Sequence, residues 1–208
     1  MGEPPVARRR LTFRRLTGLD RTGPPPSEPR SDAPWRVWTV PNAIGFVRLA
    51  LVPLFLVVVL ASDTGTEPLG PVLFAVAAWG DYADGIAARV TGQYSRFGAL
   101  LDPIVDRLLI IAGVAACWYH DLLPRWALAV LVARELFMLV AGRIALSRGV
   151  ELRINWWGRA AVWPVMSAIF FGLCGLRELG AILLYLGVAM ALVAAVLYLR
   201  DARPSTSA

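Results

Sequence analysis

The chain has 208 residues, of which 57% are hydrophobic and 17% are charged. Its mean hydropathy of +0.59 is too high for an ordinary soluble domain, and its charged fraction is too large for a single membrane anchor. The net charge of +6 is first a signal of membrane topology in a chain this apolar, so we expect membrane lipids and not nucleic acid as partner. The composition predicts an all-α polytopic membrane protein.

The chain begins with a polar segment, residues 1–35, that is rich in arginine and proline. No cleavable signal peptide is evident, because the first apolar run comes only after this segment. Its composition predicts a juxtamembrane tail that is either disordered or held on the membrane surface, where arginines attract anionic headgroups.

Apolar stretches follow, each near the length of about 20 residues that a transmembrane helix requires. There are six of them, at roughly residues 41–60, 69–88, 98–118, 124–144, 158–175 and 179–199. The sequence therefore predicts six transmembrane helices in a membrane domain of residues 36–200, followed by a short tail of residues 201–208.

The distribution of arginine predicts the orientation of these helices. If the N-terminus is cytoplasmic, the cytoplasmic segments carry most of the arginines outside the helices, and the outer loops hold only Arg125 and Arg177. Both termini and the connection between the second and third helices are then cytoplasmic, with the chain in the plasma membrane.

Four aspartates fall in the second and third predicted helices, near the cytoplasmic boundary: Asp81, Asp84, Asp102 and Asp106. Ionised groups at membrane depth are costly and are usually kept for function. Because successive helical residues turn by about 100°, each helix presents its two carboxylates on one face. Such a group would be self-repelling without a cation, so the pattern predicts two divalent ions, Mg²⁺ or Mn²⁺, with a phosphate or pyrophosphate ligand.

Small and basic residues lie between the two aspartate pairs. Gly85 and Gly98 would let a ligand approach the backbone, Ala88 leaves space on the same face, and Arg89 and Arg96 offer positive charge to phosphate. Close helix packing is the alternative explanation for the glycines. A topology anchor is the alternative for Arg89, which is compatible with both roles.

These residues form a string with fixed spacing. It runs Asp81-Tyr82-Ala83-Asp84-Gly85-Ile86-Ala87-Ala88-Arg89, followed at intervals by Gly98, Asp102 and Asp106. The string fits D-x-x-D-G-x-x-A-R-x8-G-x3-D-x3-D and resembles, at every signature position, that of the CDP-alcohol phosphatidyltransferase family.

Two further stretches are similar to parts of that family. One is Val40-Pro41-Asn42 followed by Arg48, at the start of the first predicted helix, and the other is Ala133-Arg134-Glu135 in the fourth. Alternatives remain open for both: Asn42 suits a helix N-cap, and Arg134 with Glu135 suits an ion pair between helices.

The resemblance implies a six-helix membrane enzyme, commonly a homodimer, that transfers a phosphatidyl or similar group from a CDP-linked donor such as CDP-diacylglycerol to an alcohol and releases CMP. It implies that Asp81, Asp84 and Asp102 ligate metal, and that Asp106 both contributes to the metal site and serves as the base. The remaining signature residues would border the donor, with Gly85, Ala88 and Gly98 near the cytidine and Arg89 facing phosphate.

The acceptor alcohol is indicated less directly. Relatives that use glycerol 3-phosphate tend to carry a G-K-x-K-T string where this chain has Gly158-Arg159-Ala160-Ala161-Val162. The chain is more similar to the cardiolipin synthases of the family, so phosphatidylglycerol is favoured slightly over glycerol 3-phosphate, and an inositol-type acceptor less. Four arginines are candidates for binding the acceptor or its phosphate: Arg143, Arg148, Arg153 and Arg159.

Two other functions are alternatives to a transferase. A non-enzymatic cation transporter would use the aspartates as an ion path but would not need the spacing of Gly, Ala and Arg, and a scaffold that had lost catalysis would usually lack an aspartate.

His120 stands alone in a predicted outer loop and is expected to be inert as a metal ligand. Cys117 and Cys174 fall near outer helix ends, where a disulfide is conceivable and two unpaired thiols are the default.

Overall fold

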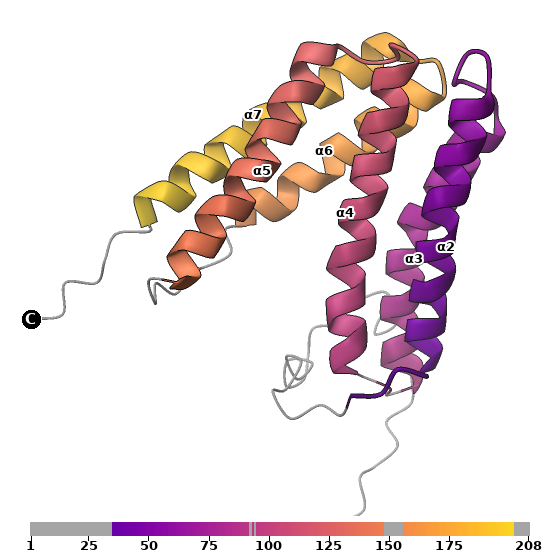
Figure 1. Ribbon diagram of the computed structural model, residues 1–208, viewed down its shortest axis with the longest axis vertical. Helices are drawn as coiled ribbons and strands as arrows, with labels where there is room; N and C mark the ends of the chain where they lie inside the picture. The colour runs from indigo at the N-terminus through magenta and orange to yellow at the C-terminus, as the bar shows by residue number, and fades with distance from the viewer. Residues whose placement is uncertain (1–34, 92, 94, 148–155, 202–208) are drawn as a thin grey trace, which may run out of the picture. The chain divides into compact units, whose positions relative to one another are not determined.

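The computed structural model describes residues 35–91, 93, 95–147 and 156–201. Every regular element in this part of the chain is a helix (Figure 1). The helices are α2 (Val40–Ala61), α3 (Leu69–Thr91), α4 (Arg96–Tyr119), α5 (Arg125–Ser147), α6 (Trp156–Leu173) and α7 (Arg177–Asp201). The predicted all-α class and the positions of the six predicted helices are confirmed, with ends that differ from the predicted ones by a few residues.

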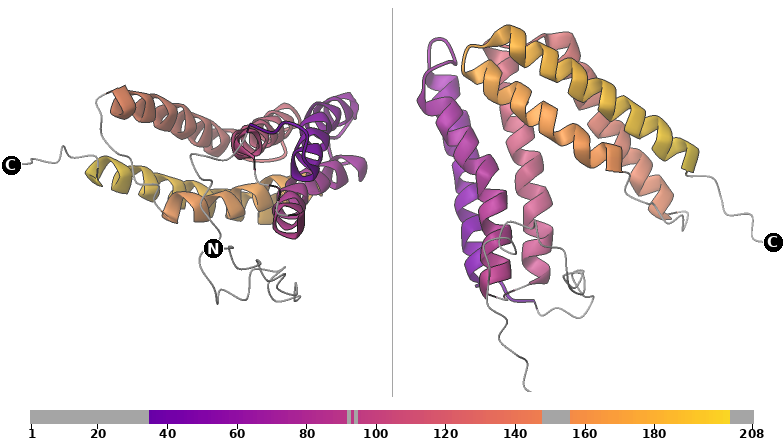
Figure 2. Two further views of the ribbon diagram at one scale, coloured as in Figure 1. Left: turned by 90° about the horizontal axis from the view of Figure 1, so that it is seen from below. Right: turned by 180° about the vertical axis from the view of Figure 1, so that it is seen from behind.

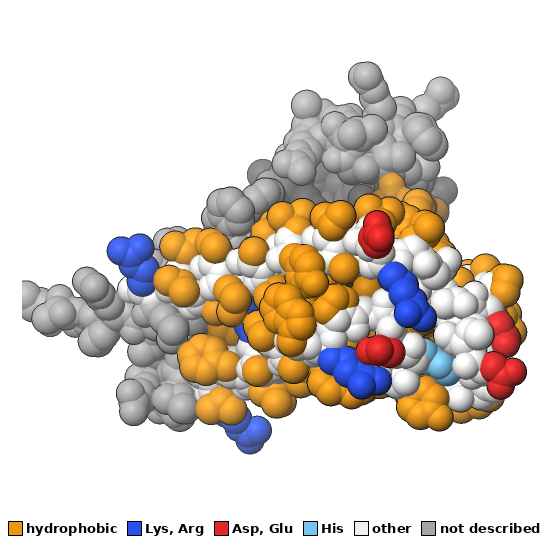
Figure 3. Space-filling model, turned by 90° about the horizontal axis from the view of Figure 1, so that it is seen from above, with side chains coloured by type: hydrophobic (Ala, Val, Ile, Leu, Met, Phe, Trp, Pro, Cys, Tyr) orange, Lys and Arg blue, Asp and Glu red, His pale blue; other side chains and the backbone are white. Residues whose placement is uncertain are grey.

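The apolar character of these helices indicates a membrane protein. Two segments in the described part of the chain are long and apolar enough to cross a membrane, Val40–Ala61 and Arg177–Leu197, and α6 holds a shorter apolar stretch, Ala160–Leu173. Large apolar side chains such as Trp79 and Trp163 are more than 70% exposed, and Figure 3 shows hydrophobic side chains along the described helices. Six membrane spans remain a prediction, because ionised side chains lower the hydropathy of α3, α4 and α5.

The chain divides into two compact units, and the division cuts across three helices. The first unit contains the described residues of Met1–Leu51 together with Val76–Arg107, so it holds the beginnings of α2 and α4 and the C-terminal part of α3. The second unit contains Val52–Ala75 and the described residues of Leu108–Ala208. It therefore holds the remainders of those three helices and all of α5, α6 and α7.

Close packing of α6 against α7 organises the second unit, and α5 also packs against α7 (Figures 1 and 2). Gly187 allows this approach, because a Cβ atom there would lie 2.6 Å from Val165 Cγ2. At Gly180 the same atom would lie 3.0 Å from the backbone oxygen of Ala168. Small residues at such crossings let two helix backbones come together, as is common in membrane proteins.

The turn after α2 contacts His120, which is the first residue after α4. Its Nε2 atom lies 2.8 Å from the backbone oxygen of Val59, and its ring covers Gly65. Gly65 has a φ of 71°, and a Cβ atom there would lie 2.5 Å from the ring, so this position requires glycine. His120 therefore has a structural role. In the same unit, Cys117 is buried and Cys174 is exposed, both as free thiols.

Candidate active site

Arg48 is the centre of the first unit. It lies in the first half of α2 and is only 1% exposed. Because a buried guanidinium is costly unless it is paired, its contacts show how the surrounding helices are organised. Its Nε atom donates a hydrogen bond of 2.9 Å to the backbone oxygen of Ala77 in α3.

The remaining nitrogens of Arg48 face three of the four signature aspartates. Nη1 lies 3.4 Å from Asp81 Oδ1 and 3.1 Å from Asp84 Oδ2, both in α3. Nη2 donates to Asp106 Oδ1 in α4 at 2.5 Å. One arginine from α2 thus joins carboxylates from two other helices, and the short contact to Asp106 is a charge-assisted hydrogen bond.

Asp102 completes this group. It lies in the same unit, near enough for its charge to act on those of Asp81, Asp106 and Arg48, so the four predicted aspartates lie in one neighbourhood. They differ in exposure, because the side chain of Asp84 is 6% exposed, whereas those of Asp81 and Asp106 are 54% and 42% exposed. The result is an acidic cluster, Asp81, Asp84, Asp102 and Asp106 around Arg48, with a buried inner part and an open outer part.

Gly80 makes room for the arginine. A Cβ atom at this position of α3 would lie 2.6 Å from both Cγ and Cδ of Arg48. Neither residue was predicted from the sequence to belong to the site: Gly80 stands one residue before the signature, and Arg48 was noted only for its similarity to the family. The signal for Arg48 was available, because an arginine inside an apolar helix requires an acidic partner.

Asn42 joins the start of α2 to the start of α4. Its Nδ2 atom lies 2.8 Å from the backbone oxygen of Val37 and 3.0 Å from Ser95 Oγ. The N-cap of α2 is Thr39, whose Oγ1 accepts a hydrogen bond from the Asn42 backbone nitrogen at 3.3 Å. The sequence alternative of Asn42 as a cap was therefore wrong, because its side chain turns to α4 and to the preceding backbone.

Gly98 lies against this connection. The Ser95 hydroxyl caps α4 by accepting from the Gly98 backbone nitrogen at 3.0 Å. A Cβ atom on Gly98 would lie 2.5 Å from Asn42 Oδ1. Of the two sequence explanations for this glycine, close helix packing accordingly has direct support in the structure.

Three carboxylates of the acidic cluster form ion pairs with Arg48, and carboxylates are also the kind of group that binds hard cations. Among the described residues, no three acidic, histidine or cysteine side chains lie close enough together to hold a metal ion. Carboxylate oxygens are nevertheless the donors that Mg²⁺ and Mn²⁺ prefer. Asp81 and Asp106 each offer one oxygen to Arg48 and are half-exposed, so it is the chemistry of these donors that fits a divalent cation.

The other predicted site residues are placed unevenly. Gly85 and Ala88 follow Asp84 on α3 and are partly exposed, and Arg143 is exposed near the end of α5, in the second unit. Arg89 and Arg159 belong to α3 and α6, but their side chains are not among those the structure describes. Arg148 and Arg153 lie outside the described residues.

Arg134 and Glu135 form an ion pair in the second unit, through Arg134 Nη1 and Glu135 Oε1. Arg134 Nε also donates to the backbone oxygen of Ala191 in α7 at 3.3 Å. The ion pair itself lies within α5, so it is the hydrogen bond from Arg134 to Ala191, and not the ion pair of the sequence alternative, that joins α5 to α7. A cavity of about 30 Å³ beside the pair is otherwise lined mainly by apolar residues.

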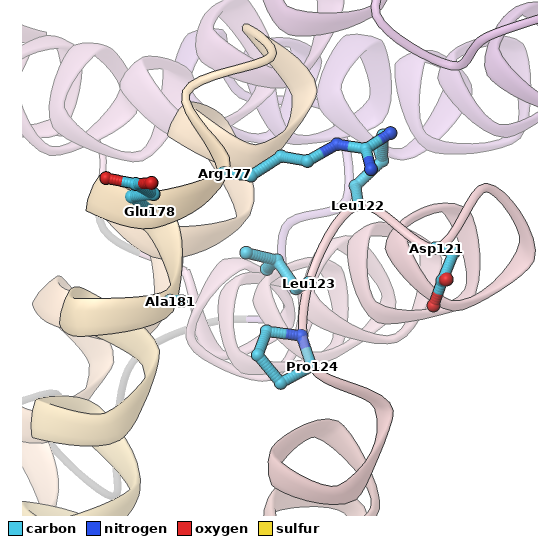
Figure 4. Close-up of a pocket in the computed structure, with 7 residues that line it drawn as sticks. All are labelled: Asp121, Leu122, Leu123, Pro124, Arg177, Glu178 and Ala181. Atoms are coloured by element: carbon cyan, nitrogen blue, oxygen red, sulfur yellow. The ribbon is translucent and has the colours of Figure 1, made fainter.

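A larger hollow, of about 330 Å³, opens elsewhere in the second unit, between the turn after α4 and the start of α7. Figure 4 shows Leu123 and Pro124 on one side of it and Arg177 and Glu178 on the other. None of the predicted site residues lines this hollow, so it adds nothing to the candidate site.

The fold and the acidic cluster define a helical membrane protein with a carboxylate centre built on a buried arginine. Residues 38–193 match the family model described as CDP-alcohol phosphatidyltransferase, and the chain belongs to this family. The resemblance found in the sequence is thereby confirmed.

Relatives of two kinds are similar to this chain. A cardiolipin synthase (CMP-forming) of Streptomyces coelicolor is 37% identical over 137 residues, which cover 64% of each protein. A CDP-diacylglycerol–glycerol-3-phosphate 3-phosphatidyltransferase of Bacillus subtilis is 31% identical, over 64% of this chain and 75% of the relative. A relative with the same name from Shigella flexneri is 29% identical over 78% of this chain and 90% of its own length. The chain thus spans somewhat less than two thirds of the Streptomyces protein.

Proposed function

We propose that this protein is a CDP-diacylglycerol-dependent phosphatidyltransferase of glycerophospholipid biosynthesis. It transfers a phosphatidyl group to a glycerol-type acceptor and releases CMP. The observation that carries the proposal is the complete family signature, whose four aspartates gather in one cluster around Arg48. The name of the Bacillus subtilis relative gives CDP-diacylglycerol and glycerol 3-phosphate, and that of the Streptomyces coelicolor relative gives cardiolipin and the formation of CMP, which supports the proposal.

The transfer exchanges one phosphorus–oxygen bond for another. The acceptor hydroxyl oxygen bonds to the phosphorus that carries diacylglycerol, the bond from that phosphorus to the oxygen of CMP breaks, and CMP leaves with that oxygen. The hydroxyl proton passes to a base, for which we propose Asp106. Arg48 engages Oδ1 of this carboxylate, which leaves Oδ2 to accept the proton, and the side chain is 42% exposed. A positioned base of this kind contributes typically 10² to 10⁴-fold.

The other aspartates complete the proposed metal site. Asp81, Asp84 and Asp102, together with Asp106, would hold Mg²⁺ or Mn²⁺, with two ions matching four carboxylates. Bound there, the cations supply charge neutralisation for the pyrophosphate of the donor. Gly85, Ala88 and Gly98 would border the cytidine, and Arg89 would face phosphate.

We propose that the cluster lies at the cytoplasmic boundary of a six-span protein in the plasma membrane, with both termini inside. A donor that is half lipid and half nucleotide needs a site where the two halves meet lipid and water at once. Two helices with sufficient length and apolarity support the membrane location, and the arginine asymmetry supports the orientation. The assembly we propose is a homodimer, as is common in the family.

For the acceptor, we favour phosphatidylglycerol, which gives cardiolipin, over glycerol 3-phosphate, which gives phosphatidylglycerophosphate. The Gly158–Val162 segment lacks the lysines and threonine of the glycerol 3-phosphate string. The relative from Streptomyces coelicolor, with its 37% identity, carries the name of a cardiolipin synthase. Arg143, Arg148, Arg153 and Arg159 are the candidates for binding the acceptor's phosphate.

The test uses the full chain purified in detergent with CDP-diacylglycerol and either Mg²⁺ or Mn²⁺. Separate reactions contain phosphatidylglycerol, glycerol 3-phosphate, or inositol phosphate, and CMP release is followed with product identification. We expect release with phosphatidylglycerol, and its loss when EDTA replaces the metal. Release only with glycerol 3-phosphate or inositol phosphate would change the acceptor, and no CMP with any acceptor would refute the transferase proposal.

A further inference from the structure

The charges around Arg48 are unbalanced. Its single positive charge meets three carboxylates within 3.4 Å, and the charge of Asp102 acts on the same group. The carboxylates of the acidic cluster therefore outnumber its one guanidinium, and its exposed members, Asp81 and Asp106, are the ones that can meet a further cation. Without Arg48, four carboxylates from α3 and α4 would repel one another with nothing between them.

The position of Arg48 is built into the packing of the first unit. The hydrogen bond from Nε to the Ala77 backbone oxygen anchors the guanidinium on α3 independently of the carboxylates. Gly80 provides the space for the aliphatic part of the side chain. Arginine suits this place because its planar group has several donors in fixed directions, which lets it engage carboxylates from both helices.

We propose that Arg48 is a positioning residue that acts as a resident counter-cation for the acidic cluster. It holds Asp81, Asp84 and Asp106 together while no metal is bound, so that the carboxylates are already gathered when a divalent cation arrives. This inference rests on the proposed function for the metal, but not on the transfer reaction. It predicts that the metal-free protein is stable because of Arg48, and that metal takes over this role when the arginine is removed.

The experiment compares the wild type with Arg48→Gln and Arg48→Lys, each as the full chain in detergent. Arg125→Gln is the matched control, because Arg125 pairs with one carboxylate, Asp121, at 3.2 Å on the exposed surface. The melting temperature, Tm, is measured by tryptophan fluorescence in EDTA and again in Mn²⁺, and Mn²⁺ binding is titrated by electron paramagnetic resonance.

In EDTA we expect Arg48→Gln to lower the Tm by roughly 10 °C, Arg48→Lys by less, and Arg125→Gln hardly at all. Mn²⁺ should raise the Tm of Arg48→Gln by a larger increment than it raises that of the wild type. If Arg48→Gln does not fold, the same comparison is made with Arg48→Lys, which keeps the charge but not the planar group.

Three results would overturn the inference. A Tm in EDTA equal to that of the control would show that Arg48 does not stabilise the metal-free cluster. An Mn²⁺ increment equal to or smaller than that of the wild type would reduce Arg48 to an ordinary structural ion pair. If the wild type does not bind Mn²⁺, the acidic cluster is not a metal site and the inference fails. A protein that shows the expected shifts but releases no CMP would instead refute the proposed reaction alone.

Discussion

Asp106 offers one oxygen to the Arg48 guanidinium and has a second one for chemistry. Its neighbours are placed differently: Asp84 is buried against Arg48, and Asp81 is mostly open but lies farther from it, at 3.4 Å. Asp106 is thus both closely positioned by Arg48 and exposed, which suits a base. The buried carboxylate of Asp84 suits a fixed metal ligand.

Asp106→Asn is expected to lower the rate of CMP release by about 10² to 10⁴-fold, because an amide cannot take the hydroxyl proton. The fold should be retained, since the amide oxygen can still accept a hydrogen bond from Arg48. CMP release and the Tm are measured on the same preparation, with Asp121→Asn as the control at an exposed ion pair. Activity close to that of the wild type would remove Asp106 from the role of base.

Gly98→Ala is expected to destabilise the protein by about 1 to 3 kcal/mol through overpacking. The added methyl group would lie 2.5 Å from Asn42 Oδ1, where α2 and α4 leave no space for it. Thermal unfolding of the purified chain measures the effect, and Ala99→Ser on the exposed side of the same turn is the control. If Gly98→Ala unfolds like the control, the glycine is not kept for packing.

At the scale of elements, the starts of α2 and α4 depend on each other. Each helix has its own N-cap, Thr39 for α2 and Ser95 for α4, and Asn42 connects the second cap to the first helix. The aspartates of α4 lie about two and three turns after Ser95, so we expect this connection to help position them relative to Arg48 of α2.

A double-mutant cycle tests this dependence. Asn42→Ala removes the hydrogen bonds that the Asn42 amide makes to the Val37 oxygen and to the Ser95 hydroxyl, and each such loss costs about 1 to 3 kcal/mol when it leaves a buried group unsatisfied. Ser95→Ala removes the same contact from the other side together with the cap. We expect a coupling of about 0.5 to 3 kcal/mol between the two changes, measured by chemical unfolding. Additive effects would mean that the two helix starts are independent.

At the scale of the whole molecule, the orientation in the membrane decides which compartment reaches the acidic cluster. From the arginine asymmetry we propose that the connection after α3 is cytoplasmic and that the connection after α2 is outside. Asp63 lies in the latter connection and Thr91 ends α3, and both are exposed.

Cysteine labelling tests this orientation in intact cells. In a chain with Cys117→Ser and Cys174→Ser, a membrane-impermeant maleimide should label Asp63→Cys and should label Thr91→Cys only after the cells are permeabilised. CMP release confirms that both variants remain folded. The opposite labelling pattern would invert the topology and place the proposed site outside the cell.

The sequence by itself determined the helices, the family and the four aspartates, because apolar runs of membrane length and a fixed-spacing signature are local properties of the chain. The helical period also predicted that Asp81 and Asp84 share one face of their helix, and that Asp102 and Asp106 share one face of theirs. Acceptor choice stays a proposal, since a binding pocket is not a local property.

Only the tertiary structure decided what lies between the two aspartate pairs. It showed that Arg48, more than thirty residues before Asp81, supplies the positive charge, that Gly80 gives it space, and that Asn42 links helices and does not cap one. These are contacts between residues far apart in the sequence, and helix periodicity carries no information about which helix a side chain meets. The requirement that a buried charge be paired was visible in the sequence, but the identity of its partners was not.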